Sequence, residues 1–499
     1  MTIRRVLVAN RGEIALRIIR ACHEEGLEAV AVYSDADRAS PYVRAADAAV
    51  HIGPAPAAQS YLLIDRILEA ARASGAQAIH PGFGFLSERA PFARAVEEAG
   101  LVFIGPPASA IDAMGDKTEA RRRMEAAGVP VVPGAMAALT DPAEAAVLAG
   151  SLGYPVLVKA AAGGGGKGMR VVRESAELAG ALESAASEAL KSFGDASVYL
   201  EKYIEEPRHV EIQILADHER TIHLGERECS VQRRHQKLLE EAPSVAVDEA
   251  LRERMGAAAV AAAQAVGYRS AGTCEFLLAR DGSFYFLEMN TRIQVEHPVT
   301  ELVYGVDLVR EQLRIMRGLP MSVPALPLSP RGWAIECRIT SEDPANAFLP
   351  STGRIEYLRS PAGPGVRWDS GVETGDDVGL FYDSMLAKLI VHGRSRADAI
   401  ARMERALWEL VVVGVATNQS FHLRLLADPD FRAGNIHIQF LEQRPDLVTG
   451  PPGPDLVERL AIAAALAEHE RRLAHKPAVA VEDGRASAWL TRARQEGLR

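Results

Sequence analysis

Two glutamates in one short segment of the chain are spaced so that they could hold a divalent cation. The segment TCEFLLARDGSFYFLEMNTRIQVEHP has two alternating runs on either side of Asp281-Gly282, a dipeptide typical of β-hairpin turns. If these two residues form the turn, Glu275 and Glu288 face each other on adjacent strands. Opposed carboxylates repel unless a cation lies between them, and Asn290 adds an oxygen on the same face. The spacing therefore predicts a magnesium site; solvated edge carboxylates are the alternative.

Polar residues continue at every second position after this hairpin. Arg292, Gln294 and Glu296 alternate with Ile293 and Val295, so an extended segment would place the three polar side chains on one face. A guanidinium beside a carboxylate can bind a small planar anion and supply a base. A structural ion pair would explain the same residues.

A glycine-rich stretch, GYPVLVKAAAGGGGKGMRVV, lies between two apolar runs that read as strands. The glycines would then form the tip of a hairpin, whose backbone N–H groups could cover phosphates as the kinase glycine loop does. Lys159 lies within the first strand and favours phosphate binding. The stretch fails the Walker pattern, because Lys167 is followed by Gly168. A flexible surface turn is the alternative.

Two further segments carry clustered polar side chains. CSVQRRHQK concentrates basic residues between Gln232 and Lys237, which in an acidic protein suggests an anion site or else a solvated basic loop. YIEEPRHVEIQIL has His209, Glu211 and Gln213 alternating with apolar residues. This pattern predicts a strand with one polar face, on which a single histidine is more often structural.

The composition excludes several classes of protein. The chain has 499 residues, of which 48% are hydrophobic and 24% are charged. These values are ordinary for globular proteins, and the length predicts about three domains. The net charge of −10 disfavours nucleic-acid binding. No apolar run approaches the roughly 20 residues that span a membrane.

The cysteines and the N-terminal sequence indicate the cellular compartment of the protein. Cys22, Cys229, Cys274 and Cys337 lie far apart and form no CxxC pair, so we expect neither a disulfide framework nor a zinc ribbon. The N-terminus has only the short apolar run VLVA and no cleavage site, which argues against a signal peptide. We therefore expect a cytoplasmic protein.

The helices and strands that carry these residues can be predicted from the periodicity of apolar residues. Residues 1–113 alternate between apolar runs and amphipathic segments, with helices expected over 13–25, 62–74 and 91–99. Such alternation predicts a parallel sheet with crossover helices. The first turn, Asn10 to Glu13, has a single glycine, so a nicotinamide site is not indicated.

Beyond residue 113, the predicted secondary structure is at first mixed, then mostly strand and finally helical. Asp116 and Glu119 have the spacing of a capping box, which would place Lys117 in the first turn of a helix. Strands and helices alternate again to about residue 315, and a proline-rich connector leads to a mostly strand-like region, 331–395. Helices are expected over 397–411 and, in the tail, over 456–473.

These segments together resemble biotin carboxylase, an ATP-grasp enzyme. VLVANRGEIA, HPGFGFLSE, GGGGKGMR, RHVEIQ, CSVQRRHQK, FLEMNTRIQVEHPVTE and DSMLAKLI are similar to that family's segments and follow its order over about residues 1–445. The resemblance implies an α/β fold in four parts. These are a parallel α/β domain at 1–114, an ATP-grasp domain at 115–330 with a mobile glycine-rich lid at about 131–205, a mostly β C-terminal domain at 331–445, and a linker with a helical tail at 446–499.

The resemblance also implies roles for individual residues. ATP would contact Lys117, Lys159, Gly165, Gly166, Glu201, Tyr203, Ile204, His209, Gln232, His235, Glu275 and Glu288. Mg²⁺ or Mn²⁺ would be held by Glu275, Glu288 and Asn290. Bicarbonate would be held by Lys237, Arg292, Gln294 and the backbone of Val295, with Glu296 as the general base. Arg338 would stabilise the biotin enolate.

The implied activity is ATP- and Mg²⁺-dependent carboxylation of biotin with bicarbonate through carboxyphosphate. The sequence has no biotin-attachment motif of the Ala-Met-Lys-Met kind and no space for a carboxyltransferase domain. We therefore expect a homodimer that works with biotin on a separate carrier protein and with a separate carboxyltransferase subunit, without nucleic acid or membrane. Two alternatives stay open here: another ATP-grasp ligase that joins a carboxylate to an amine, and a non-catalytic ATP-binding subunit. The final carboxyl acceptor is not indicated.

Overall fold

The computed structural model describes residues 3–135, 141–160, 169–193, 197–324, 328–450, 454–474 and 492. It divides into two compact units, residues 1–450 and residues 451–499. In the second unit, one helix is described, α16 (Pro454–Ala474), where the sequence predicts it. Among the described helices, none combines the length and the apolar character needed to cross a membrane.

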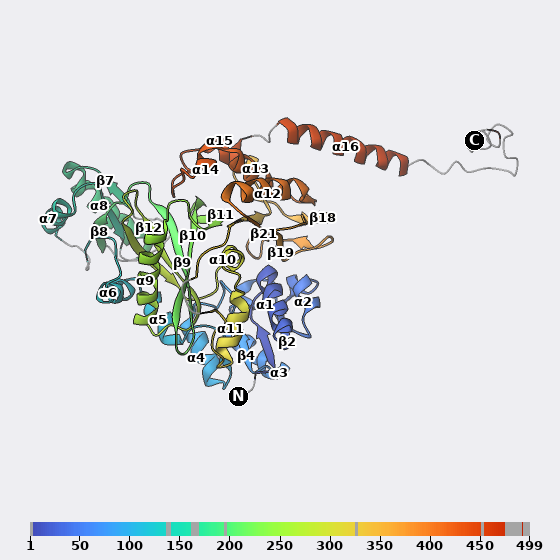
Figure 1. Cartoon of the computed structure of the whole chain (residues 1–499), viewed down its shortest axis with the longest axis horizontal. Coiled ribbons are helices and arrows are strands. Elements are labelled where there is room, and N and C mark those ends of the chain that lie inside the picture. The colour runs from blue at the N-terminus through green and yellow to red at the C-terminus, as the bar shows by residue number, and fades with distance from the viewer. Residues whose placement is uncertain are drawn as a thin grey trace. The chain divides into compact units, whose positions relative to one another are not determined.

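The N-terminal part is the predicted parallel sheet with crossover helices (Figure 1). Its five strands lie in the order β3-β2-β1-β4-β5, all parallel. The strands are β1 (Arg5–Val8), β2 (Glu28–Ser34), β3 (Ala48–Gly53), β4 (Ala78–His80) and β5 (Val102–Phe103). The helices are α1 (Gly12–Glu24), α2 (Pro41–Ala45), α3 (Ile64–Ser74), α4 (Ala90–Glu98) and α5 (Ala108–Gly115).

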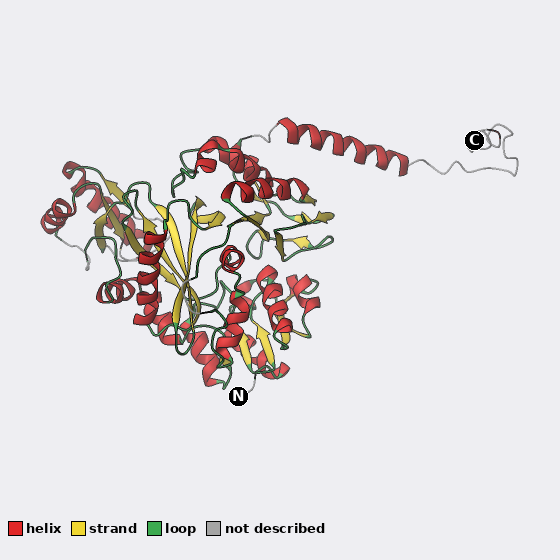
Figure 2. Cartoon of the chain, in the orientation of Figure 1, coloured by secondary structure: helices red, strands yellow, loops and turns green. Residues whose placement is uncertain are grey.

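An antiparallel sheet of eight strands forms the centre of the first unit (Figure 2). Its order is β13-β12-β9-β10-β11-β14-β21-β19. The strands are β9 (Arg208–Ala216), β10 (Thr221–Arg233), β11 (Gln236–Ala242), β12 (Ser270–Leu278), β13 (Phe284–Asn290), β14 (Trp333–Thr340), β19 (Val366–Ser370) and β21 (Met385–Gly393). Because β11 pairs with β14, one sheet continues across residue 330, where the sequence suggests a domain boundary.

The two faces of this sheet differ in chemistry. On β9, Val210, Ile212 and Ile214 face the alanine-rich helix α9 (Glu249–Ala265), which lies along β9 and β10. Small side chains such as Ala259 and Ala262 let this helix approach the sheet closely. The alternate positions of the same strand are polar, so the opposite face of the sheet is left for a polar site.

A smaller sheet carries the glycine-rich segment. Its order is β7-β6-β8, with β6 (Val156–Ala160) antiparallel to both β7 (Arg170–Val172) and β8 (Val198–Lys202). Helices α7 (Pro142–Leu152) and α8 (Ser175–Phe193) pack against it. The predicted strands on either side of the glycines are confirmed. The glycines themselves, with Gly165 and Gly166, lie outside the described residues.

Helix α6 (Lys117–Ala126) begins at the predicted residue but is capped only from one side. The Asp116 carboxylate accepts from the backbone N–H of Thr118 and of Glu119, as expected of an N-cap. The Glu119 carboxylate instead accepts from Arg122 and Arg123. The predicted reciprocal capping box is therefore wrong, because two arginines one helical turn away compete for the Glu119 carboxylate.

The remaining elements of the first unit complete the predicted order. The helices are α10 (His297–Tyr304), α11 (Leu308–Met316), α12 (Arg396–Glu409), α13 (Gln419–Ala427), α14 (Pro429–Ala433) and α15 (Pro445–Thr449). Short strands are β15 (Glu342–Asp343), β16 (Leu349–Pro350), β17 (Gly353–Arg354), β18 (Tyr357–Arg359), β20 (Asp377–Val378) and β22 (Val411–Val413).

Candidate active site

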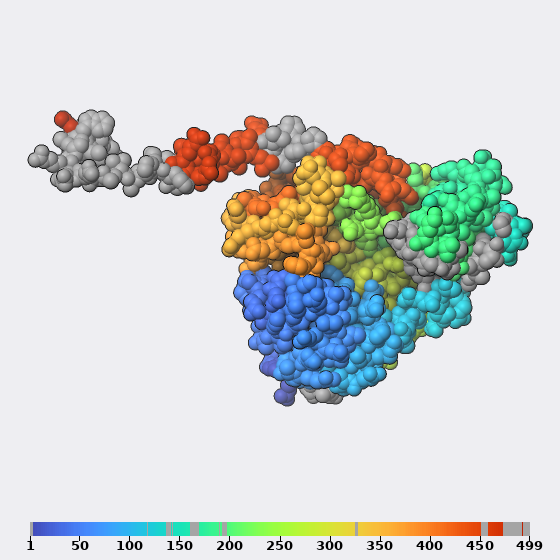
Figure 3. Space-filling view, turned by 180° about the vertical axis from the view of Figure 1, so that it is seen from behind, coloured from blue at the N-terminus to red at the C-terminus, as the bar shows by residue number. Residues whose placement is uncertain are grey.

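A cavity of about 580 Å³ lies between the N-terminal sheet, the polar face of the eight-stranded sheet and the segment before β21. Figure 3 shows the face of the molecule on which the N-terminal part, in blue, lies next to residues of the C-terminal half, in orange. The cavity brings together many residues that the sequence marked. These are His209, His235, Lys237, Glu275, Glu288, Asn290, Arg292, Gln294, Val295, Glu296 and Arg338.

A row of charged side chains crosses the polar face from strand to strand. Glu288 on β13 lies opposite Glu275 on β12, which lies opposite Glu211 on β9, which lies opposite Arg227 on β10. Cross-strand neighbours have Cβ atoms about 4.5–5.5 Å apart, so each charge acts strongly on the next. Glu211 and Arg227 are fully buried.

The predicted pairing of the two hairpin glutamates is confirmed, but the turn between them is not the predicted one. The backbone N–H of Ala279 donates to the carbonyl of Ser283, so residues 280–282 form a loop of three residues. This shifts the pairs next to the turn by one residue. A bulge at Leu287, which is 43% exposed, shifts the register back before the glutamates are reached.

Lys237 is the ion-pairing centre of the site. Its Nζ lies 2.6 Å from Glu211, 3.0 Å from Glu275 and 2.6 Å from Glu296. Burial alone would lower the pKa of Lys237, but the three carboxylates outweigh it and raise the pKa well above its ordinary value. The ammonium group is therefore held charged at the meeting point of the predicted metal site and the predicted base.

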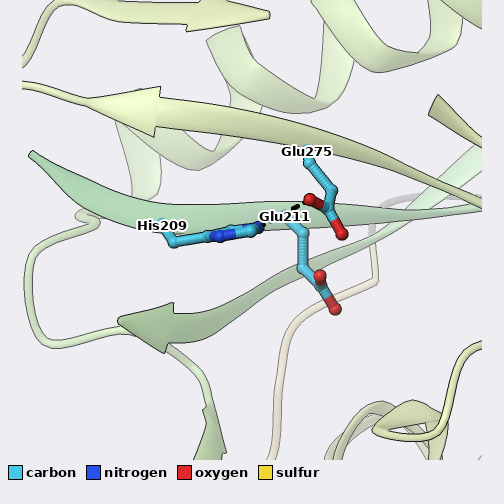
Figure 4. Close-up of side chains that lie close together, drawn as sticks. All are labelled: His209, Glu211 and Glu275. Carbon is cyan, nitrogen blue, oxygen red and sulfur yellow. Dashed lines mark ion pairs between the residues drawn. The ribbon is translucent and has the colours of Figure 1, made fainter. Parts of the chain in front are cut away.

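The Glu275 carboxylate is surrounded by donors on both oxygens. Nε2 of His209 lies 2.9 Å from one oxygen, and Figure 4 shows the ring directed at it. The other oxygen accepts from Asn290 and Gln294 as well as from Lys237. Burial would raise the pKa of Glu275, yet the charge of Lys237 and the contact with His209 hold it well below its ordinary range. Glu275 is therefore an anion within the sheet.

Glu296 lies between two cations. One of its oxygens accepts from Lys237 Nζ at 2.6 Å, and the other accepts from Arg338 Nη2 at 3.0 Å. Burial would raise the pKa of Glu296, but Lys237, Arg338 and then Arg227 outweigh it and lower the pKa. An ionised, buried carboxylate in a cavity is poised to accept a proton once a substrate draws the cations away.

The segment from Arg292 to Glu296 is not the extended strand that the alternation predicts. Residues 291–294 have no regular structure, and Val295 and Glu296 form the turn that leads into α10. Arg292 Nε pairs with Glu88 at 2.9 Å. This carboxylate from the N-terminal part was not anticipated. The predicted ionic partner of Arg292, Glu296, is taken by Lys237 and Arg338 instead.

The residues predicted at the ATP site are not all in this cavity. Gln232 does not line the cavity. It donates to His209 Nδ1 at 2.7 Å and so holds the His209 ring in position. Lys159 on β6 pairs with Glu201 on β8 in the small sheet, and Tyr203 and Ile204 follow β8. Their roles remain predictions, as do those of Lys117, whose side chain is not described, and of the glycines.

Two buried residues of the site escaped the sequence reasoning. The sequence places Glu211 on a polar strand face, and its alternation with apolar residues is the signal that could have marked it. Arg227 carried no local signal at all. Its guanidinium, fully buried, donates to five side chains from β9, β12, α10 and the segment between β13 and α10. The acceptors are Glu211, Gln213, Thr273, Gln294 and Thr300.

We expect Arg227→Lys to lower the free energy of unfolding by about 3 kcal/mol or more, because one ammonium cannot satisfy five acceptors in a buried site. Thermal and urea unfolding measure the change. Arg310→Lys is the matched control, because Arg310 is 42% exposed and pairs with Glu25. Its loss should be about 0–1 kcal/mol. Equal losses in the two variants would contradict the structural role assigned to Arg227.

The small sheet around the glycine-rich segment, the paired glutamates and the cation-rich cavity define an ATP-dependent ligase of the ATP-grasp class. Family models agree over most of the chain. The biotin carboxylase N-terminal domain matches residues 2–111, the ATP-binding domain of the carbamoyl-phosphate synthase L chain matches 116–323, and the biotin carboxylase C-terminal domain matches 336–443.

The chain is also similar to curated proteins and solved structures over most of their length. The chain is 52% identical over 442 residues to biotin carboxylase 1 of Bacillus subtilis, covering 88% of this chain and 98% of the relative. It is 53% identical over 440 residues to the biotin carboxylase of a Nostoc species, covering 88% and 98%. The biotin carboxylase domain dimer of Hydrogenobacter thermophilus 2-oxoglutarate carboxylase, solved with MgADP, ADP and bicarbonate, has a TM-score of 0.82 and 46% identity, covering 90% and 99%.

The chain therefore belongs to the biotin carboxylase family. It is an ATP-grasp ligase, and its reaction is the ATP-dependent carboxylation of biotin that biotin-dependent carboxylases require.

Proposed function

We propose that the chain carboxylates biotin attached to a separate carrier protein, with bicarbonate as carboxyl source and carboxyphosphate as intermediate. The observation that carries this proposal is the position of Glu296, whose two oxygens contact Lys237 and Arg338 in one cavity. A base and two cations that converge at one point suit an anionic substrate that must lose a proton.

Bicarbonate would bind to Lys237, Arg292, Gln294 and the backbone of Val295. Because it is an anion, it would compete with Glu296 for Lys237. Each cation that turns to the substrate would leave Glu296 less stabilised as an anion, which raises the pKa of Glu296 at the moment when it must accept a proton. Glu296 would thus be ionised at rest and become a stronger base when bicarbonate is bound.

The deprotonated bicarbonate would attack the γ-phosphorus of ATP, forming carboxyphosphate and releasing ADP. Carboxyphosphate would then break down to CO₂ and phosphate. The biotin ureido nitrogen, after losing its proton to phosphate, would attack CO₂. Arg338 would offset the negative charge on the biotin enolate, which requires Arg338 to leave Glu296.

Glu275, Glu288 and Asn290 would hold Mg²⁺ or Mn²⁺. Two carboxylates and an amide oxygen lining one cavity fit the preference of these hard cations for oxygen ligands. Glu275 now accepts from Lys237 and Asn290, so these donors would have to release an oxygen to the ion. When bound, the ion would supply positive charge to the transferring phosphate.

ATP would extend from this cavity toward the small sheet. The residues that we assign to it are Lys117, Lys159, Gly165, Gly166, Glu201, Tyr203, Ile204, His209, Gln232, His235, Glu275 and Glu288. The more distant of these residues match the family's motifs, and Lys159 and Glu201 form an ion pair. Closure of the glycine-rich lid over about 131–205 would keep water from carboxyphosphate.

The partners follow from the same reaction. We propose that the chain assembles as a homodimer and works with a biotin carboxyl carrier protein and with a separate carboxyltransferase. The dimeric Hydrogenobacter domain supports the homodimer. The four cysteines are buried thiols without disulfides, which supports a cytoplasmic location.

The experiment that tests this function measures ADP release by the purified chain with MgATP, while bicarbonate and free biotin are varied separately. We expect release to require bicarbonate and to rise with biotin. Omitting the divalent cation should abolish it. ATP turnover without bicarbonate, but with another carboxylate and an amine, would instead indicate a different ATP-grasp ligase.

A further inference from the structure

Two glutamates behind Arg338 are not used by the reaction described above. Glu240 on β11 lies directly opposite Glu336 on β14, and both are fully buried. Residues opposite each other in an antiparallel pair point to the same face, so the two carboxyl groups are neighbours. Two ionised carboxylates in this position would repel strongly in a site without water.

The hydrogen bonds of the pair are incomplete. Glu240 Oε1 accepts from Arg338 Nε at 2.7 Å. The other oxygen of Glu240 and both oxygens of Glu336 are buried without a hydrogen-bond partner among the residues that the structure describes. Buried carboxylate oxygens almost always have partners, so three orphaned oxygens on neighbouring residues require an explanation. One proton between the two residues would convert an orphaned pair into an O–H···O hydrogen bond.

Among the residues that the structure describes, no charged group neutralises Glu336 by direct contact. Lys388, on β21, donates to the carbonyl of Val295 at 2.8 Å and lies 3.2 Å from Glu13. Lys237 pairs with Glu296 and two other carboxylates of the site. Arg338 donates to Glu240 and Glu296.

Helix α10 packs against β14, and burial holds the pKa of its His297 well below its ordinary value, so this histidine is neutral. For the two glutamates, burial is the largest influence. It raises the pKa of Glu240 to about 7, opposed by Arg338, and it raises the pKa of Glu336 well above its ordinary value, opposed by Lys388.

We propose that Glu240 and Glu336 share one proton at neutral pH and act together as the positioning pair for Arg338. The proton resides on Glu336, which donates to the free oxygen of Glu240, while Glu240 remains an anion and holds the guanidinium. Arg338 then donates to both Glu240 and Glu296. It can turn from Glu296 to biotin while it keeps its ion pair with Glu240. The pair is distinct from the base and from the proposed metal ligands.

The positioning role has a consequence for pH. When the pair loses its proton at alkaline pH, a second negative charge develops beside Arg338. That charge draws the guanidinium toward the pair and away from biotin, so the biotin-dependent rate falls as pH rises. This consequence rests on the proposed carboxylase function, whereas the shared proton itself does not.

Infrared difference spectroscopy of the chain without substrates tests the shared proton directly. The parent minus Glu336→Gln spectrum at pH 7 should show the carbonyl band of a protonated carboxylic acid, shifted in D₂O. The band in this difference spectrum should disappear as pH is raised. Absence of the band at pH 7 would mean that Glu336 carries no proton and would overturn the proposal. Because this measurement needs no turnover, it stands even if the chain fails to carboxylate biotin.

The positioning role is tested by pH profiles of biotin-dependent ADP release. In Glu336→Gln, the amide can donate to Glu240 but has no proton to lose, so the alkaline fall should shift upward by about one pH unit or more. In Glu240→Gln, Arg338 loses its anchor, and kcat/KM for biotin should fall by about 100-fold. Profiles of Glu336→Gln and the parent that coincide would remove the pair from the reaction.

Glu241→Gln is the matched control for these variants. Glu241 is equally buried, is adjacent in sequence, and pairs with Arg396 and Trp333 instead of Arg338. Its loss should lower the thermal midpoint and leave the pH profile unchanged. A control that moved the alkaline limb as much as Glu336→Gln does would assign the shift to general loosening of the sheet and overturn the proposal.

Discussion

Replacing Glu296 by glutamine should reduce bicarbonate-dependent ADP release by about 10²- to 10⁴-fold, because the amide has the same shape but cannot take a proton. The amide oxygen can still accept from one of the two cations that contact Glu296, so the cavity should keep its form. The measurement is kcat for ADP release at saturating MgATP and bicarbonate, on protein whose folding has been verified by its thermal midpoint. Undiminished activity would remove Glu296 as the base.

Glu301→Gln controls for the loss of a buried carboxylate near the site. Glu301 lies in α10, pairs with Arg17 and Arg367, and does not line the cavity. This variant should be less stable than the parent but should keep bicarbonate-dependent ADP release in the folded protein. A comparable loss of kcat in both variants would show that the effect of Glu296→Gln is structural.

Replacing Lys237 by methionine should abolish bicarbonate-dependent turnover and also destabilise the fold by about 3–5 kcal/mol at neutral pH. The methionine fills a similar volume but leaves Glu211, Glu275 and Glu296 without the cation that they share. Urea unfolding at pH 7 measures the stability, and ADP release measures the activity. Lys191→Met, at an exposed position of α8, is the control and should change neither.

The stability difference between Lys237→Met and the parent should depend on pH. In the parent, the folded-state pKa values of Glu275 and Glu296 are lowered, so their ionisation contributes stability above the unfolded pKa of about 4.3, and this contribution is lost as pH falls through the folded values. Without Lys237, burial is less opposed and the folded pKa values rise. The gap between the two proteins should therefore narrow between pH 7 and pH 4; a constant gap would contradict the ion-pairing role of Lys237.

Local patterns predicted most of the secondary structure and part of the site. The parallel N-terminal sheet follows from alternating apolar runs and amphipathic helices. The pairing of Glu275 with Glu288 followed from a single turn dipeptide. That pairing was correct although the loop was not, because the bulge at Leu287 compensated for a loop one residue longer. Turn length and bulges depend on the neighbouring strand, which the dipeptide does not specify.

Periodicity and turn chemistry act over a few neighbouring residues, so they predict the strands and many of the charged side chains of the site. Which of these charges lie in contact depends on the fold. A bulge at Leu238 shifts the register of β11, so the Lys237 side chain lies on the polar face of the sheet. There it contacts Glu211 on β9 and Glu296 before α10. No local sequence pattern predicts Arg227 or the pair of Glu240 and Glu336. Their partners come from distant segments, and only burial in one sheet makes their charges depend on one another.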